Sequence, residues 1–114
     1  IQRDVIDKNG LESYKTTDLL EVMPQLDVLY MTRVQKERFF NEDDYLRLRD
    51  SYILTPDKLE TAKKELKILH PLPRVNEISV KIDEDPRACY FKQVRNGKFI
   101  RMALILKLLK EAEA

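Results

Sequence analysis

Two short segments carry groups that could bind a small molecule. The first, residues 32–38, reads TRVQKER and presents Arg33, Gln35 and Glu37. The planar guanidinium of an arginine pairs with a carboxylate or a phosphate through two parallel hydrogen bonds. Glu37 follows Arg33 by four residues, so on a helical turn its carboxylate is close enough to hold the guanidinium in place. The segment is therefore typical of a site for an acidic ligand.

The second segment, residues 69–74, offers acceptors instead of donors. It reads LHPLPR, and Pro71 and Pro73 have no backbone N–H. The carbonyl groups of Pro71 and Leu72 are expected to point outward as acceptors, and a cis bond before one of the prolines would fit so abrupt a turn. A rigid row of carbonyls binds N–H groups. Together the two segments predict a site for a molecule that carries both a carboxylate and an amine or amide.

Both segments also have a purely structural interpretation. The charges of Arg33, Glu37 and Arg38 are typical of a solvated turn, and closely spaced prolines are typical of a rigid loop. His70 is the only histidine, which makes it a candidate general base. A packing or hydrogen-bonding role is favoured for His70, because no cysteine or serine lies near it in the sequence to form a dyad.

Each segment follows an apolar run that predicts a β-strand. Residues 27–32 are apolar over their middle, which is typical of a strand buried on both faces of a parallel sheet. Residues 66–69 form a second, shorter run. In open α/β sheets, ligands bind beyond the carboxyl ends of the strands. If these two strands are parallel, residues 32–38 and 70–74 share one rim of the sheet.

The rest of the chain alternates between helical and extended patterns, which favours an α/β fold. Helices are expected at residues 1–9, 18–23, 42–49, 57–65, 86–94 and 99–112, a helical turn at 35–40, and extended segments at 11–16 and 51–55. Gly10 would end the first helix, and Thr16 or Thr17 would cap the second. Asn41 would cap the third, and residues 96–97, Asn-Gly, would separate the last two. The expected architecture is a partial Rossmann-like parallel sheet of three strands, flanked by helices.

Composition narrows the class of protein. The 114 residues suffice for one domain or a piece of one, and the absence of a methionine at Ile1 leads us to expect a trimmed chain. Lysine and arginine number 21 against 20 acidic residues, a balance that does not favour a nucleic-acid partner. No apolar run is long enough to cross a membrane. Cys89 is the only cysteine, so an internal disulfide and a thiolate metal site are excluded, and a reducing, cytoplasmic setting is expected.

The last predicted helix carries apolar residues on more than one of its faces, from Phe99 to Leu109. A helix that is apolar nearly all round is expected to be buried. Two alternatives remain open. The helix is buried within this chain's own small core, or it leaves an apolar patch that a further part of the protein covers.

Three motifs resemble one enzyme family. Residues 27–39, DVLYMTRVQKERF, residues 69–78, LHPLPRVNEI, and residues 85–105, DPRACYFKQVRNGKFIRMALI, are similar in order and spacing to the carboxyl-terminal part of aspartate carbamoyltransferase catalytic chains. The resemblance covers essentially the whole chain. The wording of the later motifs is most similar to the versions found in multifunctional pyrimidine-synthesis polypeptides.

The resemblance implies a reaction. Carbamoyl phosphate and L-aspartate give N-carbamoyl-L-aspartate and phosphate in pyrimidine biosynthesis, with no metal or organic cofactor. The amine attacks the carbamoyl carbon, a tetrahedral oxyanion forms and phosphate leaves, so catalysis is mostly positioning and electrostatic stabilisation of charge. The family's phosphate-binding Ser-Thr-Arg-Thr-Arg segment and its catalytic histidine have no counterpart in this sequence. No residue here is therefore assigned a catalytic role, and the segment alone is expected to be inactive.

The resemblance also implies substrate-binding roles. Arg33 would bind the side-chain carboxylate of aspartate, with help from Gln35. The carbonyl of Leu72 would accept from the aspartate amine and the carbamoyl NH2, and that of Pro71 from the carbamoyl NH2. The bond from Leu72 to Pro73 would be cis. Ornithine carbamoyltransferases carry a cysteine in place of Pro71, so the sequence favours aspartate over ornithine.

Four further residues receive supporting roles from the resemblance. Glu37 would orient the arginine that binds aspartate, and Arg38 would make contacts between domains in the closed state. Tyr45 would lie in a mobile loop that closes over aspartate. Arg101 would be a structural arginine near the site.

The resemblance implies partners and a division of the chain. Residues 1–95 would form part of an aspartate-binding domain, and residues 96–114 a helix that returns to an amino-terminal carbamoyl-phosphate domain. Expected partners are the two substrates, that amino-terminal domain and further copies in a homotrimer, with regulatory chains or fused pyrimidine enzymes left open. Two other functions remain alternatives: a non-catalytic structural or interaction module on the same scaffold, and a carbamoyltransferase for another amino acid.

Overall fold

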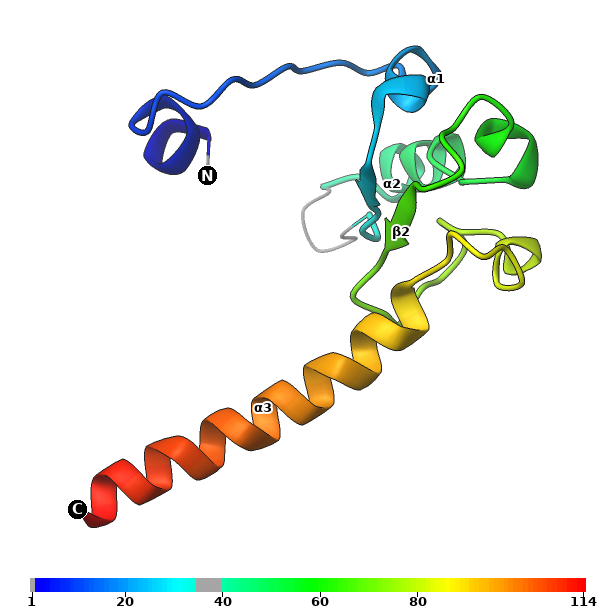
Figure 1. Ribbon diagram of the computed structural model, residues 1–114. Helices are drawn as coiled ribbons and strands as arrows, with labels where there is room; N and C mark the ends of the chain where they lie inside the picture. The colour runs from blue at the N-terminus through cyan, green and yellow to red at the C-terminus, as the bar shows by residue number, and fades with distance from the viewer. Residues whose placement is uncertain (1, 35–39) are drawn as a thin grey trace.

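The computed structural model describes residues 2–34 and 40–114, and of residues 2 and 48–51 it describes the backbone alone. In chain order the regular elements are a π-helix at Gln2–Asp7, helix α1 at Leu19–Val22, a 3-10 turn at Met23–Gln25, strand β1 at Val28–Tyr30, helix α2 at Glu42–Ser51, a 3-10 turn at Pro56–Leu59, strand β2 at Lys67–Leu69, a 3-10 turn at Val80–Ile82 and helix α3 at Tyr90–Glu113. Figure 1 shows the strands at the centre and α3 leading away from them as a long arm.

Strands β1 and β2 pair in parallel, as the sequence predicts. Val28 pairs with Lys67 and Tyr30 with Leu69. The N–H of Met31 donates to the Leu69 carbonyl over 2.8 Å, just beyond the carboxyl end of β1. Both strands are shorter than the predicted ranges. The expected α/β class is confirmed, but the expectation of three strands is wrong, because the sheet in the described part of the chain has two.

The prediction that the first strand is buried on both faces is wrong. Leu29 is buried, whereas Val28 is 53% and Tyr30 is 54% exposed. Successive side chains of a strand point to opposite faces of the sheet. Because the core packs against one face only, alternate residues of β1 lie on the exposed face.

The far edge of β2 is also paired. Ile68 forms an isolated parallel bridge with Ala88, and the N–H of Cys89 donates to the Ile68 carbonyl over 2.9 Å. A second parallel bridge joins Leu54 to Ile78, which gives the expected extended segment at residues 51–55 one point of pairing. The first bridge adds a pairing on the side of β2 away from β1, and the second joins a segment before β2 to one after it.

The core is built from apolar residues of the two strands, the 3-10 turns, the first residue of α3 and the segments between these elements. Its buried members in the described part of the chain are Met23, Leu29, Leu54, Leu59, Leu66, Ile68, Ile78, Ile82 and Tyr90. Tyr90 is the first residue of α3, so the core fixes the base of that helix.

Side-chain caps begin two of the helices. Asp18 caps α1, because its Oδ1 accepts from the N–H groups of Leu20 and Glu21, so the prediction of a threonine cap is wrong. Asn41 caps α2 as predicted, with its Oδ1 accepting from the Asp43 N–H over 2.9 Å. An acceptor at this position satisfies a helix donor that has no partner within the helix.

The chain before α1 differs from the prediction in part. The expected first helix is present as the short π-helix Gln2–Asp7, and Gly10 ends it with a φ of +63°. A left-handed residue after a helix is a common end, and glycine adopts it without strain. The expected strand at residues 11–16 is absent from the described structure. Alternating residues are not enough for a strand without a partner, and Tyr14 and Thr16 instead donate from their hydroxyls to the Glu21 carboxylate.

The helix expected at residues 57–65 is also wrong. The structure has a 3-10 turn at Pro56–Leu59, with the proline in the first turn as expected. The chain then continues through tight turns, such as the one in which the Ala62 N–H donates to the Leu59 carbonyl over 3.2 Å. This path places both Leu59 and Leu66 in the core, which a straight helix over the same residues would not require.

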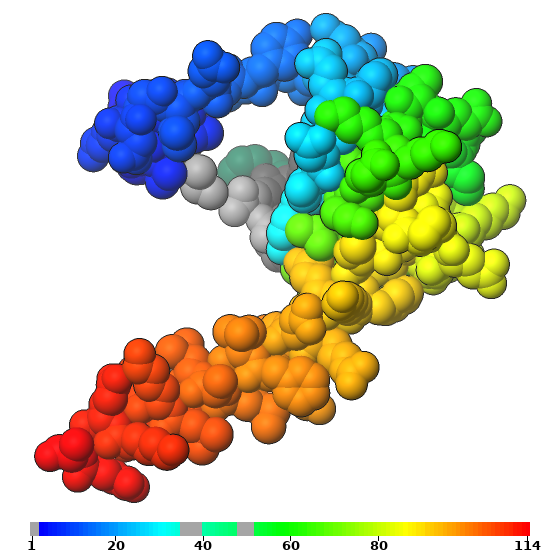
Figure 2. Space-filling model, viewed as in Figure 1, coloured from blue at the N-terminus to red at the C-terminus, as the bar shows by residue number. Residues whose placement is uncertain are grey.

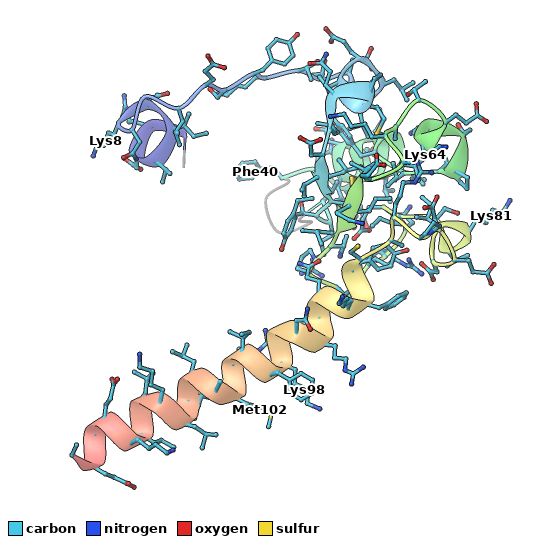
Figure 3. All side chains as sticks on the ribbon, viewed as in Figure 1. Lys8, Phe40, Lys64, Lys81, Lys98 and Met102 are labelled. Carbon is cyan, nitrogen blue, oxygen red and sulfur yellow. The ribbon has the colours of Figure 1, made fainter. Side chains whose placement is uncertain are left out.

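Helix α3 runs without a break through residues 96–97, so the predicted separation into two helices is wrong, and the helix begins at Tyr90 instead of at residue 86. A glycine inside a helix costs about 1 kcal/mol relative to alanine, which strong helix formers on both sides offset. The arm is exposed, with Ile100 at 68% and Ile105 at 58%. In Figure 2 the arm projects beyond the part of the chain that surrounds the sheet, and in Figure 3 the side chain of Met102 points away from that part.

The exposure of α3 excludes one of the two alternatives left open by the sequence. The helix is not buried within the core that the described residues form. It presents its apolar side chains to the surroundings instead. None of the helices in the described residues is long and apolar enough to cross a membrane.

Candidate functional site

The two segments predicted to form the site begin side by side, at the carboxyl ends of the two strands. Tyr30 and Leu69 are paired at the carboxyl ends of β1 and β2. Arg33 and Leu72 each lie three residues beyond those ends. Because the strands are parallel, the two segments leave the sheet at the same edge, as the sequence predicted.

A side chain of α3 joins the two strand exits. The N–H of His70 donates to Oε1 of Gln93 over 2.9 Å, and Nε2 of Gln93 donates to the Tyr30 hydroxyl over 3.1 Å. The amide thus uses both of its ends. Gln93 holds the helix, the exit of β1 and the exit of β2 in one arrangement. Sequence reasoning missed this residue, since a polar residue in a predicted helix gives no sign of such a bridge.

A small pocket of about 210 Å³ lies at this edge. It is lined by Tyr30, Pro71, Gln93, Val94, Gly97 and Arg101. Two residues predicted for the site, Pro71 and Arg101, therefore lie at one pocket, although they are thirty residues apart in the chain.

The turn after β2 has the backbone geometry expected for displayed carbonyls. The bond from Leu72 to Pro73 is cis, as the family resemblance implied, and Leu72 has a φ of +48°. The N–H of Leu72 donates to Nδ1 of His70 over 2.8 Å. Within the residues that the structure describes, no donor occupies the carbonyl oxygens of Pro71 and Leu72. The only backbone N–H of this turn, that of Leu72, is therefore used within the turn, whereas its carbonyl oxygens stay available as acceptors.

His70 and Glu77 form a buried pair beneath this turn. Both are almost inaccessible, with 0% and 4% of their surface exposed, and Nε2 of His70 lies 2.8 Å from Oε1 of Glu77. The hydrogen-bonding role predicted for His70 is confirmed. Glu77 was not predicted, although an acidic residue seven positions after a buried histidine is a signal in retrospect.

The Glu77 carboxylate is held from several directions. Its Oε2 accepts from the N–H groups of Val75 and Asn76, each over 3.0 Å. Burial by itself would raise the pKa of Glu77, but hydrogen bonds from these backbone groups, from its own N–H and from His70 outweigh burial and lower it. Glu77 is therefore ionised at neutral pH.

A second cluster fixes the end of the same turn. Both terminal nitrogens of Arg74 donate to Asp83, one of them over 2.6 Å to Oδ2, and the Tyr90 hydroxyl also donates to this carboxylate. The Arg74 guanidinium lowers the pKa of Asp83 to about 2. Burial and the contact with Asp83 raise the pKa of Tyr90 to about 12. The cluster links the turn after β2 to the first residue of α3.

The remaining predicted residues lie at different places. Arg33 is exposed beyond β1, and Tyr45 is half-buried on α2. Arg101 is exposed on α3, with its guanidinium beside Gly97. Gln35, Glu37 and Arg38 lie outside the described residues, so their predicted roles stay predictions.

The described side chains also bear on metal binding. Within residues 2–34 and 40–114, there is no group of three or more His, Cys, Asp or Glu side chains that could hold a metal ion.

Several known proteins with similar sequences belong to one enzyme family. The family described as "Aspartate/ornithine carbamoyltransferase, Asp/Orn binding domain" matches residues 1–108. The aspartate carbamoyltransferase catalytic subunits of Clostridium acetobutylicum and Clostridium botulinum are 61% and 58% identical over 109 residues. Each match covers 96% of this chain and 36% of the relative, so the chain spans about a third of the length of these relatives.

Solved structures agree with the sequence relatives. The catalytic subunit of M. jannaschii aspartate transcarbamoylase superimposes with a TM-score of 0.80 at 37% identity, over 96% of this chain and 37% of that one. Aspartate transcarbamoylase from Trypanosoma cruzi, in complex with carbamoyl phosphate and aspartate, gives 0.76 at 40% identity, over 88% and 33% of the two chains. The resemblance of the three sequence motifs to aspartate carbamoyltransferase catalytic chains is confirmed.

Proposed function

Because this chain belongs to the aspartate/ornithine carbamoyltransferase family through its Asp/Orn-binding domain, we propose that it is the aspartate-binding portion of an aspartate carbamoyltransferase catalytic chain. In the complete chain, the amine of L-aspartate attacks the carbamoyl carbon of carbamoyl phosphate. The products are N-carbamoyl-L-aspartate, an intermediate of pyrimidine biosynthesis, and phosphate. The observation that carries the proposal is the parallel pairing of Tyr30 with Leu69. Because of this pairing, the donor segment and the acceptor turn both begin at the carboxyl ends of the two strands.

The donor segment binds the acidic groups of aspartate. Arg33 pairs with the side-chain carboxylate, since a guanidinium matches a carboxylate with two parallel hydrogen bonds. Gln35 assists at the same segment, and Glu37 orients the guanidinium. Arg38 makes contacts between domains in the closed state, and Tyr45 belongs to the segment that closes over the amino acid.

The acceptor turn binds the nitrogens of the reaction. The Leu72 carbonyl accepts from the aspartate amine and from the carbamoyl NH2, and the Pro71 carbonyl accepts from the carbamoyl NH2. Within the described residues no donor occupies these two carbonyl oxygens, which supports these roles. Arg101 supports the same edge from α3, where it lines the pocket with Pro71. Catalysis then comes mainly from orientation of the two reactants.

The exposed arm of α3 meets a further domain. Residues 1–95 form part of the aspartate-binding domain, and residues 96–114 return to an amino-terminal domain that binds carbamoyl phosphate. The apolar exposure of Ile100 and Ile105 supports this assignment, because a covered face avoids contact of apolar side chains with water. The complete enzyme is a cytoplasmic homotrimer in this proposal, and regulatory chains or fused pyrimidine enzymes are further candidate partners.

A chimaera tests the proposal. It joins residues 1–114 to the remaining, amino-terminal portion of the Clostridium acetobutylicum catalytic subunit, which is 61% identical over the shared part. We expect the chimaera to form N-carbamoyl-L-aspartate from carbamoyl phosphate and L-aspartate, and not to carbamoylate L-ornithine. Binding of neither substrate would favour a non-catalytic module. Turnover of another amino acid in place of aspartate would favour a different acceptor.

A further inference from the structure

The run Pro71-Leu72-Pro73 contains a single backbone N–H, that of Leu72. This N–H points inward, to Nδ1 of His70 at 2.8 Å. A histidine that accepts from the N–H two residues later closes a small ring with the backbone, in the manner of an Asx turn. The conformation of the turn is therefore set by the imidazole of His70.

The hydrogen bonds of His70 fix its proton. Nδ1 accepts from a backbone N–H, so it carries no hydrogen itself. The ring hydrogen is therefore on Nε2, which donates to Oε1 of Glu77 at 2.8 Å. Which of the two histidine nitrogens carries the hydrogen is commonly set by the hydrogen bond that the other nitrogen makes. Glu77 thus selects the only tautomer that can hold the Leu72 N–H.

Glu77 is itself held in place. Its second oxygen accepts from the backbone N–H groups of Val75 and Asn76, and its own carbonyl accepts from the Leu54 N–H over 2.8 Å. Glu77 and His70 are 4% and 0% exposed, so water does not compete for these bonds. A chain of fixed contacts runs from the backbone after the turn, through Glu77 and His70, to the Leu72 amide.

We infer that His70 and Glu77 are positioning residues for the reaction. They hold the Leu72 amide inward, so that the carbonyls of Pro71 and Leu72 stay directed at the amine and the carbamoyl NH2 of the substrates. This inference rests on the proposed function, because it names the residues that act through the acceptor turn. Neither side chain touches a substrate. A displacement of about 1 Å at such a group can lower a rate by about a hundredfold.

Two substitutions of His70 separate its two nitrogens. The oxygen of His70→Asn can replace Nδ1 as the acceptor for Leu72, since asparagine forms this ring with the N–H two residues later. The longer His70→Gln can replace Nε2 as the donor to Glu77, but leaves the Leu72 N–H without its acceptor. Both variants remove the ring, so loss of packing is similar in the two. Only the hydrogen bond to Leu72 differs.

Hydrogen exchange and kinetics on the chimaera test the inference. Pro71 and Pro73 have no backbone N–H, so hydrogen exchange in residues 71–73 reports the Leu72 N–H alone. We expect His70→Gln to speed this exchange roughly tenfold or more, the equivalent of one lost hydrogen bond, and to raise the KM for aspartate by roughly tenfold. His70→Asn should change both quantities less. Partial unfolding lowers the apparent kcat without changing KM, so a change in KM is not a mere loss of folded protein.

Glu77→Gln provides the second test. It replaces one carboxylate oxygen by an NH2 group, so one of the bonds to Val75, Asn76 or His70 is lost. We expect faster Leu72 exchange and a raised KM for aspartate here too. The inference is overturned if His70→Asn and His70→Gln behave alike in exchange and in KM, or if Glu77→Gln changes neither. The exchange result stands even if the wild-type chimaera forms no carbamoylaspartate, which would overturn the proposed function instead.

Discussion

Tyr30 and Leu69 are register partners at the carboxyl ends of two parallel strands. One of them precedes a segment with an arginine, and the other precedes a turn in which the Pro71 and Leu72 carbonyls accept no hydrogen bond from the described residues. In our proposal, this pairing brings donors for a carboxylate and acceptors for an amine to the same end of the sheet. The same edge is tied to α3 by Gln93, which contacts the Tyr30 hydroxyl and the His70 N–H.

Substitution of Arg33 tests the donor side. We expect Arg33→Ala in the chimaera to lower kcat/KM for aspartate by at least about a hundredfold, because a charge-assisted hydrogen bond contributes about 1.5–3 kcal/mol and this pair has two. Arg33→Lys should recover only part of the loss, since an ammonium cannot form the two parallel bonds. Steady-state kinetics with varied aspartate measure the effect. Full activity of Arg33→Ala would show that the assigned role is wrong.

Gln93 offers a test of how the edge is held. Gln93→Met keeps the size and the helix propensity of the side chain but removes its hydrogen bonds to Tyr30 and His70. We expect the free energy of unfolding to fall by about 1–3 kcal/mol, because a partly buried N–H loses its partner. The control is Lys92→Met on the same helix, where the side chain is exposed. Urea unfolding of the chimaera compares the two, and equal stabilities would contradict the bridge.

The Arg74–Asp83 pair predicts a dependence of stability on pH. The pKa of Asp83 is about 2 in the folded protein against an ordinary value of 3.8. A lowered pKa means that the charged form stabilises the fold above the ordinary value, and that this contribution is lost as the pH falls through about 2. We expect Asp83→Asn to be less stable than wild type by about 2 kcal/mol at pH 7, and the difference to shrink as the pH falls from about 4 to 2.

Urea unfolding at a series of pH values measures this difference. Lys81→Ala is the matched control, because Lys81 lies in the same turn region and projects away from the body in Figure 3. We expect this control to resemble wild type at every pH. A difference between wild type and Asp83→Asn that stayed constant down to pH 2 would contradict the role of the Asp83 charge.

Gly97→Ala tests the continuity of α3. An alanine methyl would lie 3.5 Å from Nη1 of Arg101, which is ordinary contact. Since Gly97 is inside the helix, alanine should raise the free energy of unfolding by about 0.5–1 kcal/mol. Thermal unfolding of the chimaera measures the change. Destabilisation would indicate that the helix is interrupted at this residue.

Local sequence patterns correctly predicted the parallel pairing of two strands and the ends of some helices. The run at residues 27–32, the cap at Asn41 and the end at Gly10 each depend on near neighbours. The predicted helix break at Gly97 is wrong, because a glycine inside a helix costs only about 1 kcal/mol and the flanking helix formers offset this cost. The predicted strand at residues 11–16 is wrong because a strand needs a partner, which alternation of residue types does not supply.

The positions of the two candidate segments were predictable, because each segment follows a strand end, as at Arg33 and Leu72. Their common edge followed from the parallel sheet and not from either segment alone. Gln93 and Glu77 were missed, because each acts through a partner that is distant in the chain or across a turn. Residue types show which groups can bond, and the fold decides which of them meet.

A crystal structure of the chimaera with N-(phosphonacetyl)-L-aspartic acid tests the central claim most directly. The Trypanosoma cruzi relative has been solved in complex with this compound. We predict that the Arg33 guanidinium binds a carboxylate of the compound and that the Leu72 carbonyl accepts from its amide N–H, each at about 3 Å. A complex in which either group is turned away from the bound compound would contradict the account.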